Sequence, residues 1–169
     1  MTATVTVREA RPDEYERLAA LVLEAYEAVL GPDLDSDYAA ELADVATRAE
    51  EGETLVAVDG AGEIAGCITY VPGPGPLAWF DSPAEAGMRV LAVAGQAQRR
   101  GVGAALVGAC VDRARAAGKV RLLLHTTASF TVAQRMYERL GFRRDPERDR
   151  VLASGLLLLA YVLELNPGR

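Results

Sequence analysis

The segment from Gln98 to Ala104 combines residue types that can hold a phosphate group. It reads Gln-Arg-Arg-Gly-Val-Gly-Ala and joins a buried apolar run to the start of an expected helix. The first backbone N–H groups of a helix have no partners within the helix and carry partial positive charge. Glycines at positions 101 and 103 allow a ligand to come close to the backbone, and Arg99 and Arg100 add two cations. We therefore predict that this turn binds a phosphate or a pyrophosphate.

Single residues exclude two common phosphate-binding motifs. A dinucleotide-binding fingerprint needs a third glycine at position 106, where this chain has Leu106. A Walker motif needs a lysine directly after its second glycine, and the sole lysine of the chain is Lys119. A glycine-containing turn that carries two solvated arginines and binds nothing is the alternative at this point.

A second segment, residues 133–142, supports a more specific interpretation. It reads Ala-Gln-Arg-Met-Tyr-Glu-Arg-Leu-Gly-Phe. The first segment, Gln98-x-x-Gly101-x-Gly103, is preceded by Arg89-Val90-Leu91-Ala92-Val93 and is similar to the pyrophosphate-binding motif of the GNAT acetyltransferases. The second segment resembles a further motif of that family, with matching spacing and order. The expected order of elements resembles the family along nearly the whole chain.

The resemblance implies a fold and a cosubstrate. GNAT-like acyl-CoA N-acyltransferases have a mixed α/β fold, in which a central, mostly antiparallel sheet splays between its fourth and fifth strands and carries helices on both faces. The pantetheine arm of acetyl-coenzyme A would lie in this gap, and its pyrophosphate would meet the N–H groups of the turn. By position, the cofactor-binding residues would be Leu91, Ala92, Val93, Gln98, Arg99, Arg100, Gly101, Val102, Gly103, Ala104 and Ala133.

The resemblance also assigns catalytic roles for direct attack of an amine on the thioester, without a covalent acyl-enzyme. Tyr137 matches the tyrosine that the family often uses as general acid toward the departing thiolate, whose thiol has a pKa of about 8.5. A backbone N–H near Leu91 would donate to the oxyanion. Because Tyr137 shares one helical face with Ala133 and Met136, a role in packing alone is the alternative.

The general base is harder to place. Deprotonating an alkyl ammonium of pKa about 10.4 at neutral pH costs roughly 4.6 kcal/mol, so some group must accept that proton, directly or through water. Many family members have a glutamate on the fourth strand, where this chain has Gly87. Glu85 lies two residues earlier, on the same face if the strand extends back that far, and is the expected base. A solvated carboxylate at a strand end, or bulk water acting on an amine of low pKa, is the alternative.

Three other side chains have two interpretations each, and Phe130 departs from the family pattern. His125, the only histidine, ends the expected fifth strand and is either structural or a proton relay. Phe130 replaces an asparagine that the family often has at the start of its fourth helix, which removes an amide that commonly contacts the cofactor arm. Trp79 and Phe80 either line the acceptor pocket or pin their loop to the core.

The elements that must position these residues alternate along the chain. Helical spacing of apolar residues predicts a helix that begins at Pro12 and ends at Gly31-Pro32, and Thr131 with Gln134 predicts a capping box. The further expected helices are 38–50, 101–118 and 131–140. The expected strands are 5–7, 54–58, 64–71, 86–93, 120–124, a short one from Phe142, and 156–163. The order β-α-α-β-β-β-α-β-α-β-β predicts a single domain, residues 1–169, with a mixed sheet and helices on both faces.

Charge and composition exclude several classes of protein. The net charge of −6 argues against a broad nucleic-acid surface. Cys67 and Cys110 form no metal-binding pattern, so no metal is expected. The longest apolar run, Gly155 to Leu163, is too short to span a bilayer. We expect a cytoplasmic protein without a membrane partner, and a homodimer through the last strands is compatible with the pattern. The acidic residues that would either attract a cationic substrate or form a solvated turn are Asp33, Asp35 and Asp37.

Together these features predict an acetyl-coenzyme A-dependent N-acetyltransferase whose acceptor is a primary amine of a small molecule or peptide. The main alternative is a protein that binds acetyl-coenzyme A without transfer, either a sensor or an inactive paralogue, and Gly87 and Phe130 keep it open. A third reading is a structural or interaction module whose arginine turn merely binds sulfate or phosphate groups.

Overall fold

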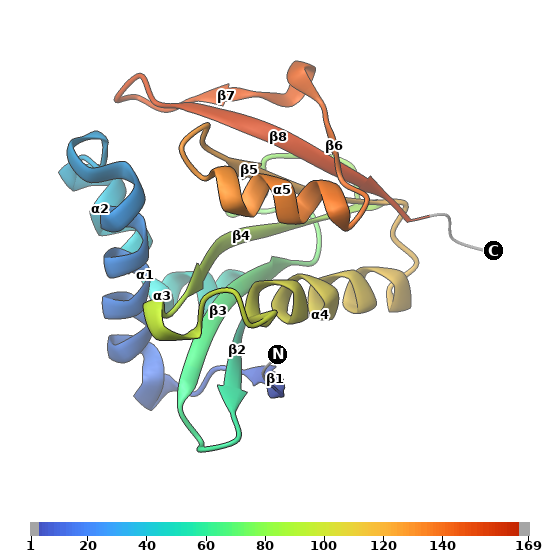
Figure 1. The fold of residues 1–169 in the computed structure, drawn as a ribbon. Helices are drawn as coiled ribbons and strands as arrows, with labels where there is room; N and C mark the ends of the chain where they lie inside the picture. Colours follow the sequence, from blue (N-terminus) through green and yellow to red (C-terminus); the bar gives the residue numbers. More distant parts are fainter. Residues whose placement is uncertain (1–3, 166–169) are drawn as a thin grey trace.

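The computed structural model describes residues 4–165 and shows a mixed sheet with helices on both faces (Figure 1). Within these residues the sheet has eight strands in the order β1-β2-β3-β4-β5-β8-β6, and β7 pairs with β8. Neighbouring strands are antiparallel except β4 and β5, which are parallel. The strands are β1 (Val5–Glu9), β2 (Glu53–Asp59), β3 (Ile64–Val71), β4 (Glu85–Val93), β5 (Arg121–Thr126), β6 (Arg143–Arg144), β7 (Arg150–Val151) and β8 (Leu157–Glu164). The α-helices are α1 (Tyr15–Leu30), α2 (Ser36–Ala43), α3 (Val45–Glu51), α4 (Val102–Ala116) and α5 (Thr131–Arg139).

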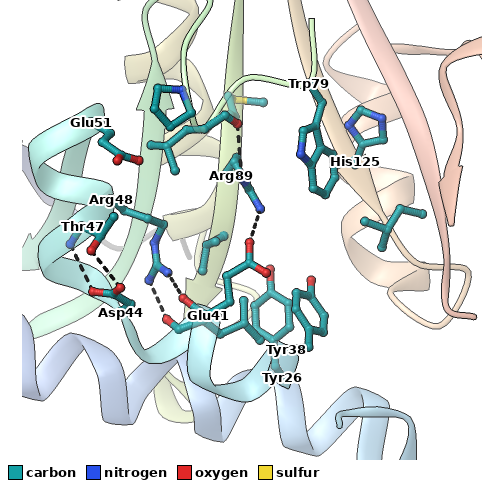
Figure 2. A pocket seen from close by; sticks show the side chains of 16 residues that line it. Tyr26, Tyr38, Glu41, Asp44, Thr47, Arg48, Glu51, Trp79, Arg89 and His125 are labelled. Carbon is teal, nitrogen blue, oxygen red and sulfur yellow. Dashed lines mark hydrogen bonds and ion pairs between the residues drawn. The ribbon is translucent and has the colours of Figure 1, made fainter. Parts of the chain in front are cut away.

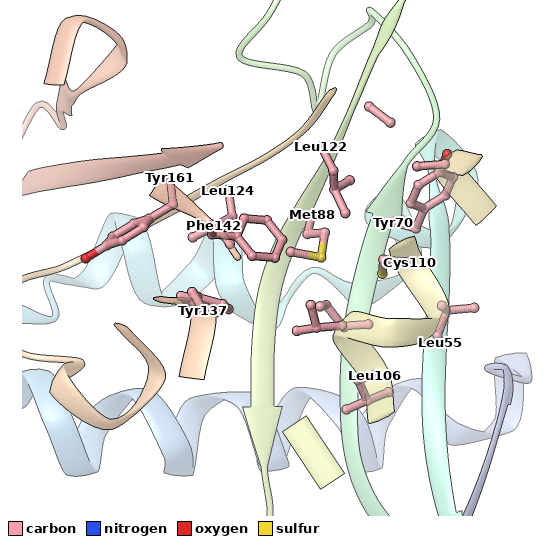
Figure 3. Packing of buried hydrophobic residues seen from close by; sticks show 14 of the residues in the cluster. Leu55, Tyr70, Met88, Leu106, Cys110, Leu122, Leu124, Tyr137, Phe142 and Tyr161 are labelled. Carbon is pink, nitrogen blue, oxygen red and sulfur yellow. The ribbon is translucent and has the colours of Figure 1, made fainter. Parts of the chain in front are cut away.

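The strands bury both of their faces because helices pack on each side of the sheet. Alternate strand residues point to opposite faces, so Leu55 and Val56 of β2 belong to different apolar clusters. The cluster under α4 and α5 includes Leu106, Met88 and Tyr137 (Figure 3). The cluster under α1, α2 and α3 is made by Leu18, Val22, Leu42, Val45, Val56, Cys67 and Ala92. The predicted fold class is therefore confirmed.

Strand β4 changes its pairing half-way along its length. Its first residues, Glu85–Gly87, pair with Arg121–Leu123 of β5, and the described residues form no further pairs between these two strands. Val90 has φ 57, and the register against β3 shifts between Cys67 and Thr69, which marks a β-bulge. Since β5 goes on pairing with β8 along its whole length, β4 and β5 part beyond the third residue pair.

The single helix predicted over residues 38–50 is wrong, because α2 and α3 are separate helices. Asp44, between them, has the non-helical ψ of 68. Its carboxylate accepts hydrogen bonds from the backbone N–H of Thr47 at 3.2 Å and from its hydroxyl at 2.8 Å. Aspartate competes with helical bonding by capping nearby N–H groups, and here it ends one helix and starts the next.

The capping box predicted for α5 is also wrong. Phe130 occupies the N-cap position and makes no side-chain cap bond. Gln134 Nε2 instead donates to the carbonyls of Thr127 and Ala128, at 2.9 and 3.1 Å. Its Oε1 accepts a bond from the Tyr161 hydroxyl at 3.0 Å. Gln134 therefore ties the loop after β5 to β8. None of the helices formed by residues 4–165 is long and apolar enough to cross a membrane.

Candidate active site

The turn before α4 presents a row of backbone donors. Arg99 and Gly101 have positive φ values of 66 and 82, a conformation that glycine adopts without strain. The first backbone bond at the start of α4 runs from Ala105 N to Gly101 O, at 3.0 Å. Within residues 4–165, the backbone N–H groups of residues 99–104 donate no hydrogen bond. The turn can therefore offer several convergent donors to an anion.

The side chains at this turn leave the donors accessible. Arg99 and Arg100 are exposed, and no carboxylate of the described chain forms an ion pair with either. A Cβ at Gly103 would lie 3.2 Å from Met136 Sδ, so glycine lets the first turn of α4 pack closely against α5. The turn combines two free cations with close approach to backbone N–H groups, as a diphosphate requires.

The gap between β4 and β5 offers further unpaired groups. Among residues 4–165, residues 91–93 have no partner strand on the edge that faces β5, and the bulge leaves Val90 and Leu91 without register partners on β3. A cavity in this gap is lined by residues that include Leu91, Thr127, Phe130, Ala133 and Tyr137. Thr127 Oγ1 is buried there and has no hydrogen-bond partner within the described part of the chain. Because buried polar groups are normally paired, the gap fits an extended ligand that carries amides.

A second cavity, of about 220 Å³, adjoins the gap (Figure 2). Side chains of α1, α2, α3, β4, β5, β8 and the loop before β4 form its walls. Tyr26, Tyr38, Arg89 and His125 line both cavities. A molecule in the second cavity can therefore reach one that lies between the parted strands.

The model of the acetyltransferase (GNAT) family matches residues 15–142, which contain the turn, the gap and most of the second cavity. This chain belongs to the GNAT acetyltransferase family. Acetyl transfer is thus the general activity of the domain, and the cavities described above are its candidate active site.

Solved structures agree with the family assignment. A GNAT acetyltransferase from Staphylococcus aureus Mu50 superposes with a TM-score of 0.76 at 16% identity, covering 96% of this chain and 100% of that one. A GCN5-related N-acetyltransferase from Kribbella flavida superposes with a TM-score of 0.70 at 24% identity, covering 95% of this chain and 98% of that one. YncA from Salmonella typhimurium, solved with its cofactor acetyl-CoA, superposes with a TM-score of 0.67 at 20% identity, covering 96% of this chain and 94% of that one. At these identities the likeness establishes the shared fold. No curated protein sequence matches the chain.

In this acetyltransferase, Tyr137 lies at the α5 side of the gap. Its side chain packs against Phe142 and Tyr161, with ring centroids 5.8 and 6.1 Å apart, and only 6% of the residue is exposed. Burial raises the pKa of the phenol well above its ordinary value of 10, so the hydroxyl keeps its proton at neutral pH. The hydroxyl forms no hydrogen bond with another described residue. Tyr137 therefore both packs and presents a protonated hydroxyl.

His125 lies on the other side of the gap, and its tautomer is set by one hydrogen bond. Its Nε2 is 2.8 Å from the carbonyl oxygen of Arg148, and a carbonyl can only accept, so Nε2 carries the proton. Nδ1 of the neutral ring is then free to accept a proton. Burial lowers the pKa of His125 below 6.5; the cations of Arg150 and Arg89 add to this, while the Arg148 carbonyl and Asp149 act against it. The imidazole is therefore an unprotonated base at neutral pH.

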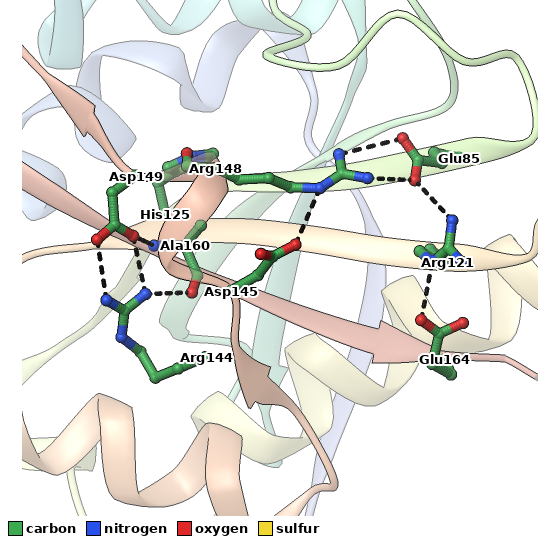
Figure 4. A network of polar contacts seen from close by, with 9 residues as sticks. All are labelled: Glu85, Arg121, His125, Arg144, Asp145, Arg148, Asp149, Ala160 and Glu164. Atoms are coloured by element: carbon green, nitrogen blue, oxygen red, sulfur yellow. Dashed lines mark hydrogen bonds and ion pairs between the residues drawn. The ribbon is translucent and has the colours of Figure 1, made fainter.

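Glu85, the predicted base, is held in an ion-pair network at the start of β4 (Figure 4). Its carboxylate accepts bonds from Arg148 at 3.2 and 2.8 Å and from Arg121 at 3.3 Å. Only 5% of its side chain is exposed. Both arginines occupy this carboxylate, and Glu85 does not line either cavity of the described residues. The structure thus places Glu85 apart from Tyr137 and His125.

Gly87 has a physical reason to be glycine. A Cβ at this position would lie 3.0 Å from Phe80 Cε1 and 3.5 Å from the Leu123 carbonyl oxygen. Phe80 therefore fills the space that a side chain at position 87 would need. At the position where many family members have a glutamate side chain, this chain has Gly87, and the ring of Phe80 from the loop before β4 occupies that space.

Other predicted residues divide between the cavity and the scaffold. Trp79 lines the second cavity, and its ring lies 4.9 Å from that of His125. Phe130 lines the gap, and its ring meets that of Tyr26 edge to face, with the ring centroids 5.1 Å apart. Asp35 caps α2 by accepting a bond from the backbone N–H of Tyr38 at 2.7 Å. The three aspartates of the predicted acidic turn line neither cavity of the described chain: Asp33, Asp35 and Asp37.

Sequence reasoning did not identify two arginines of the second cavity, Arg48 and Arg89. Arg89 had a signal: a charged residue lies within the otherwise apolar run of β4, and such residues are seldom buried without a function or a partner. Arg48 had no comparable signal, because a single arginine on a short polar helix is ordinarily solvated.

Proposed function

We propose that this acetyltransferase moves the acetyl group of acetyl-coenzyme A to a primary amine of a small molecule or peptide. One observation carries the proposal: the free N–H groups of residues 99–104 directly follow the strand that parts from β5, and a second cavity opens into the same gap. The turn of residues 99–104 suits the diphosphate of coenzyme A. The gap between β4 and β5 suits its amide-containing pantetheine arm, and the second cavity suits an acceptor amine. Both substrates can thus meet in one ternary complex by direct attack.

The proposed cofactor contacts run from the turn into the gap. Backbone N–H groups of residues 99–104 would bind the pyrophosphate, with Gln98 and the side chains of Arg99 and Arg100 at its rim. Backbone groups of residues 91–93 would pair with the amides of the pantetheine arm. Ala133 lines the same gap, and Thr127 Oγ1 would gain the partner that it lacks. The acetyl-CoA in the YncA structure supports this choice of cosubstrate.

The residues around the gap can divide the chemistry between them. His125 Nδ1 would accept the proton of the amine, directly or through a water molecule, as the nitrogen attacks the thioester carbon. The backbone N–H of Leu91, freed from the β3 ladder by the bulge, would donate to the carbonyl oxygen as negative charge builds on it. When the carbon–sulfur bond breaks, Tyr137 would donate its proton, or a hydrogen bond, to the sulfur.

The high pKa of Tyr137 is compatible with this role. Transfer from a phenol to a thiolate whose thiol has a pKa of about 8.5 in water is uphill. Burial in the gap raises the pKa of the thiol for the same reason that it raises that of the phenol. Because burial acts on both groups, the difference between their pKa values stays smaller than the difference between the buried phenol and a thiol in water.

We prefer His125 to Glu85 as the base on geometry. His125 lines both cavities, whereas Glu85 is engaged by Arg121 and Arg148. The Arg148 side chain binds Glu85 and its backbone carbonyl binds His125. Glu85 therefore serves to hold the segment that orients the histidine.

The test is release of thiol from acetyl-coenzyme A in the presence of a panel of primary amines. The proposal expects release that depends on both the amine and the enzyme, with an N-acetylated product found by mass spectrometry. A rise in melting temperature with acetyl-coenzyme A but no amine-dependent thiol release would instead support the sensor or inactive paralogue. Absence of stabilisation by either acetyl-coenzyme A or free coenzyme A would favour the structural module.

A further inference from the structure

Arg89 places a largely buried cation at the centre of the second cavity. Its side chain is only 16% exposed, and its guanidinium carbon lies 4.5 Å from the centroid of the Trp79 ring. Its NH1 donates to the Leu77 carbonyl at 3.2 Å, and its NH2 pairs with Glu41 Oε1 at 2.9 Å (Figure 2). Glu41 is the sole carboxylate that pairs with Arg89 within residues 4–165.

The Glu41 carboxylate is a replaceable partner. It belongs to α2, on the opposite wall of the cavity, and 55% of its side chain is exposed. An exposed side chain loses rotamer freedom to make such a pair, and solvent screens the attraction, so the pair is weak. A carboxylate that enters the cavity can take its place on Arg89, while Glu41 returns to water.

Arg48 adds a second cation to the same cavity. Only 5% of this residue is exposed, and its two terminal nitrogens donate to the carbonyls of Glu41 and Leu42 at 2.8 and 2.7 Å. These bonds cap the end of α2 but bring no negative charge. Arg48 Nε is buried without a hydrogen-bond partner, and no carboxylate of residues 4–165 forms an ion pair with the guanidinium. Burial lowers the pKa of Arg48, as it does for a cation that lacks a counter-ion.

Apart from Glu41, the carboxylates that line the cavity form no ion pair with either arginine within residues 4–165. Asp44 is exposed and is engaged by Thr47 at the start of α3. Glu51 is exposed at the end of that helix. The three carboxylates of the cavity are thus exposed to water, whereas the two arginines are largely buried. A cavity with this charge distribution attracts an ammonium at its mouth and holds an anion within.

Resting on the proposed function, we propose that the acetyl acceptor is a small zwitterion, an amine that carries a carboxylate or similar oxyanion, and that Arg89 binds this anion in exchange for Glu41. Arg89 and His125 both flank the Trp79 ring, at 4.5 and 4.9 Å. An amino acid, whose amine and carboxylate are separated by few bonds, can reach both. Its anion binds Arg89 and its amine faces His125 Nδ1.

Matched acceptors test the anion directly. Free amino acids and their C-terminal amides are compared by kcat/KM for thiol release. The amine of the amide is the less basic, so basicity alone favours the amide. The proposal expects the free acid to be better by roughly 10- to 100-fold, the usual value of a charge-assisted hydrogen bond. Equal values, or a preference for the amide or for a peptide amine, would overturn it.

Two variants separate anion binding from a merely structural ion pair. Arg89→Gln should raise KM for the free acid by roughly 10- to 100-fold and abolish the preference over the amide, and Arg89→Lys should recover part of it. Glu41→Gln should lower KM for the free acid about threefold, because the competing carboxylate is gone. If the Arg89–Glu41 ion pair were only structural, Arg89→Gln and Glu41→Gln would both raise KM for the free acid. That result would contradict the proposal that the acceptor's anion replaces Glu41 on Arg89.

Controls distinguish this failure from failure of the proposed function. Arg8 and Glu14 form a bidentate pair, at 2.9 and 2.8 Å, away from both cavities, and Arg8→Gln should leave the acid-to-amide ratio unchanged. Turnover of amides without any preference for acids refutes only the acceptor class. Absence of amine-dependent turnover with every acceptor, despite binding of acetyl-coenzyme A, refutes the proposed activity itself.

Discussion

At the scale of single residues, the candidate acid and base reach the gap from opposite faces of the sheet. Tyr137 belongs to the cluster under α5. His125 alternates with Leu122 and Leu124 of that cluster and so points to the other face, toward Trp79. An amine attacks from one side of the thioester carbonyl while the thiolate leaves, so groups on two sides suit the two proton movements.

Replacing Tyr137 by phenylalanine should separate chemistry from packing. The ring and its contacts with Phe142 and Tyr161 stay, and only the hydroxyl is lost. We expect kcat to fall roughly 10²- to 10⁴-fold, the range for one positioned proton donor, with affinity for acetyl-coenzyme A changed less than about twofold. Thiol-release kinetics and calorimetric titration measure the two quantities. Unchanged kcat would show that Tyr137 serves packing alone.

His125 should set the acidic limb of the pH profile. Since burial lowers its pKa below 6.5, the neutral ring that accepts a proton persists through neutral pH. The value of kcat/KM should therefore be flat near pH 7 and fall as pH drops through that lowered pKa. His125→Gln should reduce kcat/KM roughly 100-fold and remove this limb. Glu85→Gln should keep the limb; its loss in the Glu85 variant alone would restore Glu85 as the base.

At the scale of elements, the start of α4 should control cofactor affinity. Changing both Arg99 and Arg100 to glutamine removes two exposed cations beside the free N–H groups and leaves the glycines in place. We expect the Kd of coenzyme A to rise about tenfold and to depend less on salt, because each cation contributes a screened attraction. Calorimetric titration at two salt concentrations measures both effects.

The matched control for this variant is Arg115→Gln, at the other end of the same helix. It removes one positive charge, half of the charge that the double variant removes, from an exposed position in the last turn, at the opposite end of α4 from the N-terminal donors. Similar losses of affinity in both variants would show that net charge matters and that the turn does not.

The elements that sequence could predict are those with long, regular patterns. The buried run of β4 and the glycine turn before α4 were identifiable because apolar periodicity and glycine position act locally. The break at Asp44 was missed, although Asp44-x-x-Thr47 contained the signal for a helix start. Strand β7 is two residues long, too short for any periodicity, and it forms only because β8 lies beside it.

The second cavity could not be predicted in the same way. Arg89 and Glu41 are 48 residues apart in sequence, and Glu85 and Arg148 are 63 apart. No local pattern encodes such pairs, since they depend on how α2 and the segment before β7 pack on the sheet. Glu85 was correctly noticed as a carboxylate at the start of β4, but its partners came from distant segments.

At the scale of the whole molecule, Glu85 joins separate parts of the sheet. Its partners Arg121 and Arg148 come from β5 and from the turn before β7, and Arg121 also binds Glu164 of β8 at 2.7 Å. The expected homodimer through the last strands and the cytoplasmic location stay predictions. Val151 and Leu157 expose apolar side chains on β7 and β8, which is where such a dimer would form.

Glu85→Gln should destabilise the fold because it breaks a buried, multiply bonded carboxylate. The arginine partners are partly exposed and can regain water, so we expect a loss of about 2 kcal/mol, below the full value for a buried pair. Urea denaturation measures this free energy. Glu164→Gln is the control, since Glu164 is 60% exposed and its pair should contribute less than about 0.5 kcal/mol. Equal losses would place Glu85 among ordinary surface pairs.

The central claim is that one diphosphate-bearing cosubstrate occupies the turn and the parted strands together. A crystal structure of the protein grown with saturating coenzyme A tests it most directly. We predict density for the diphosphate on the backbone N–H groups of residues 99–104 and for the pantetheine arm between β4 and β5, beside residues 91–93. A structure in which the turn is empty, or in which coenzyme A binds elsewhere and the gap is filled by the protein's own side chains, would contradict the account.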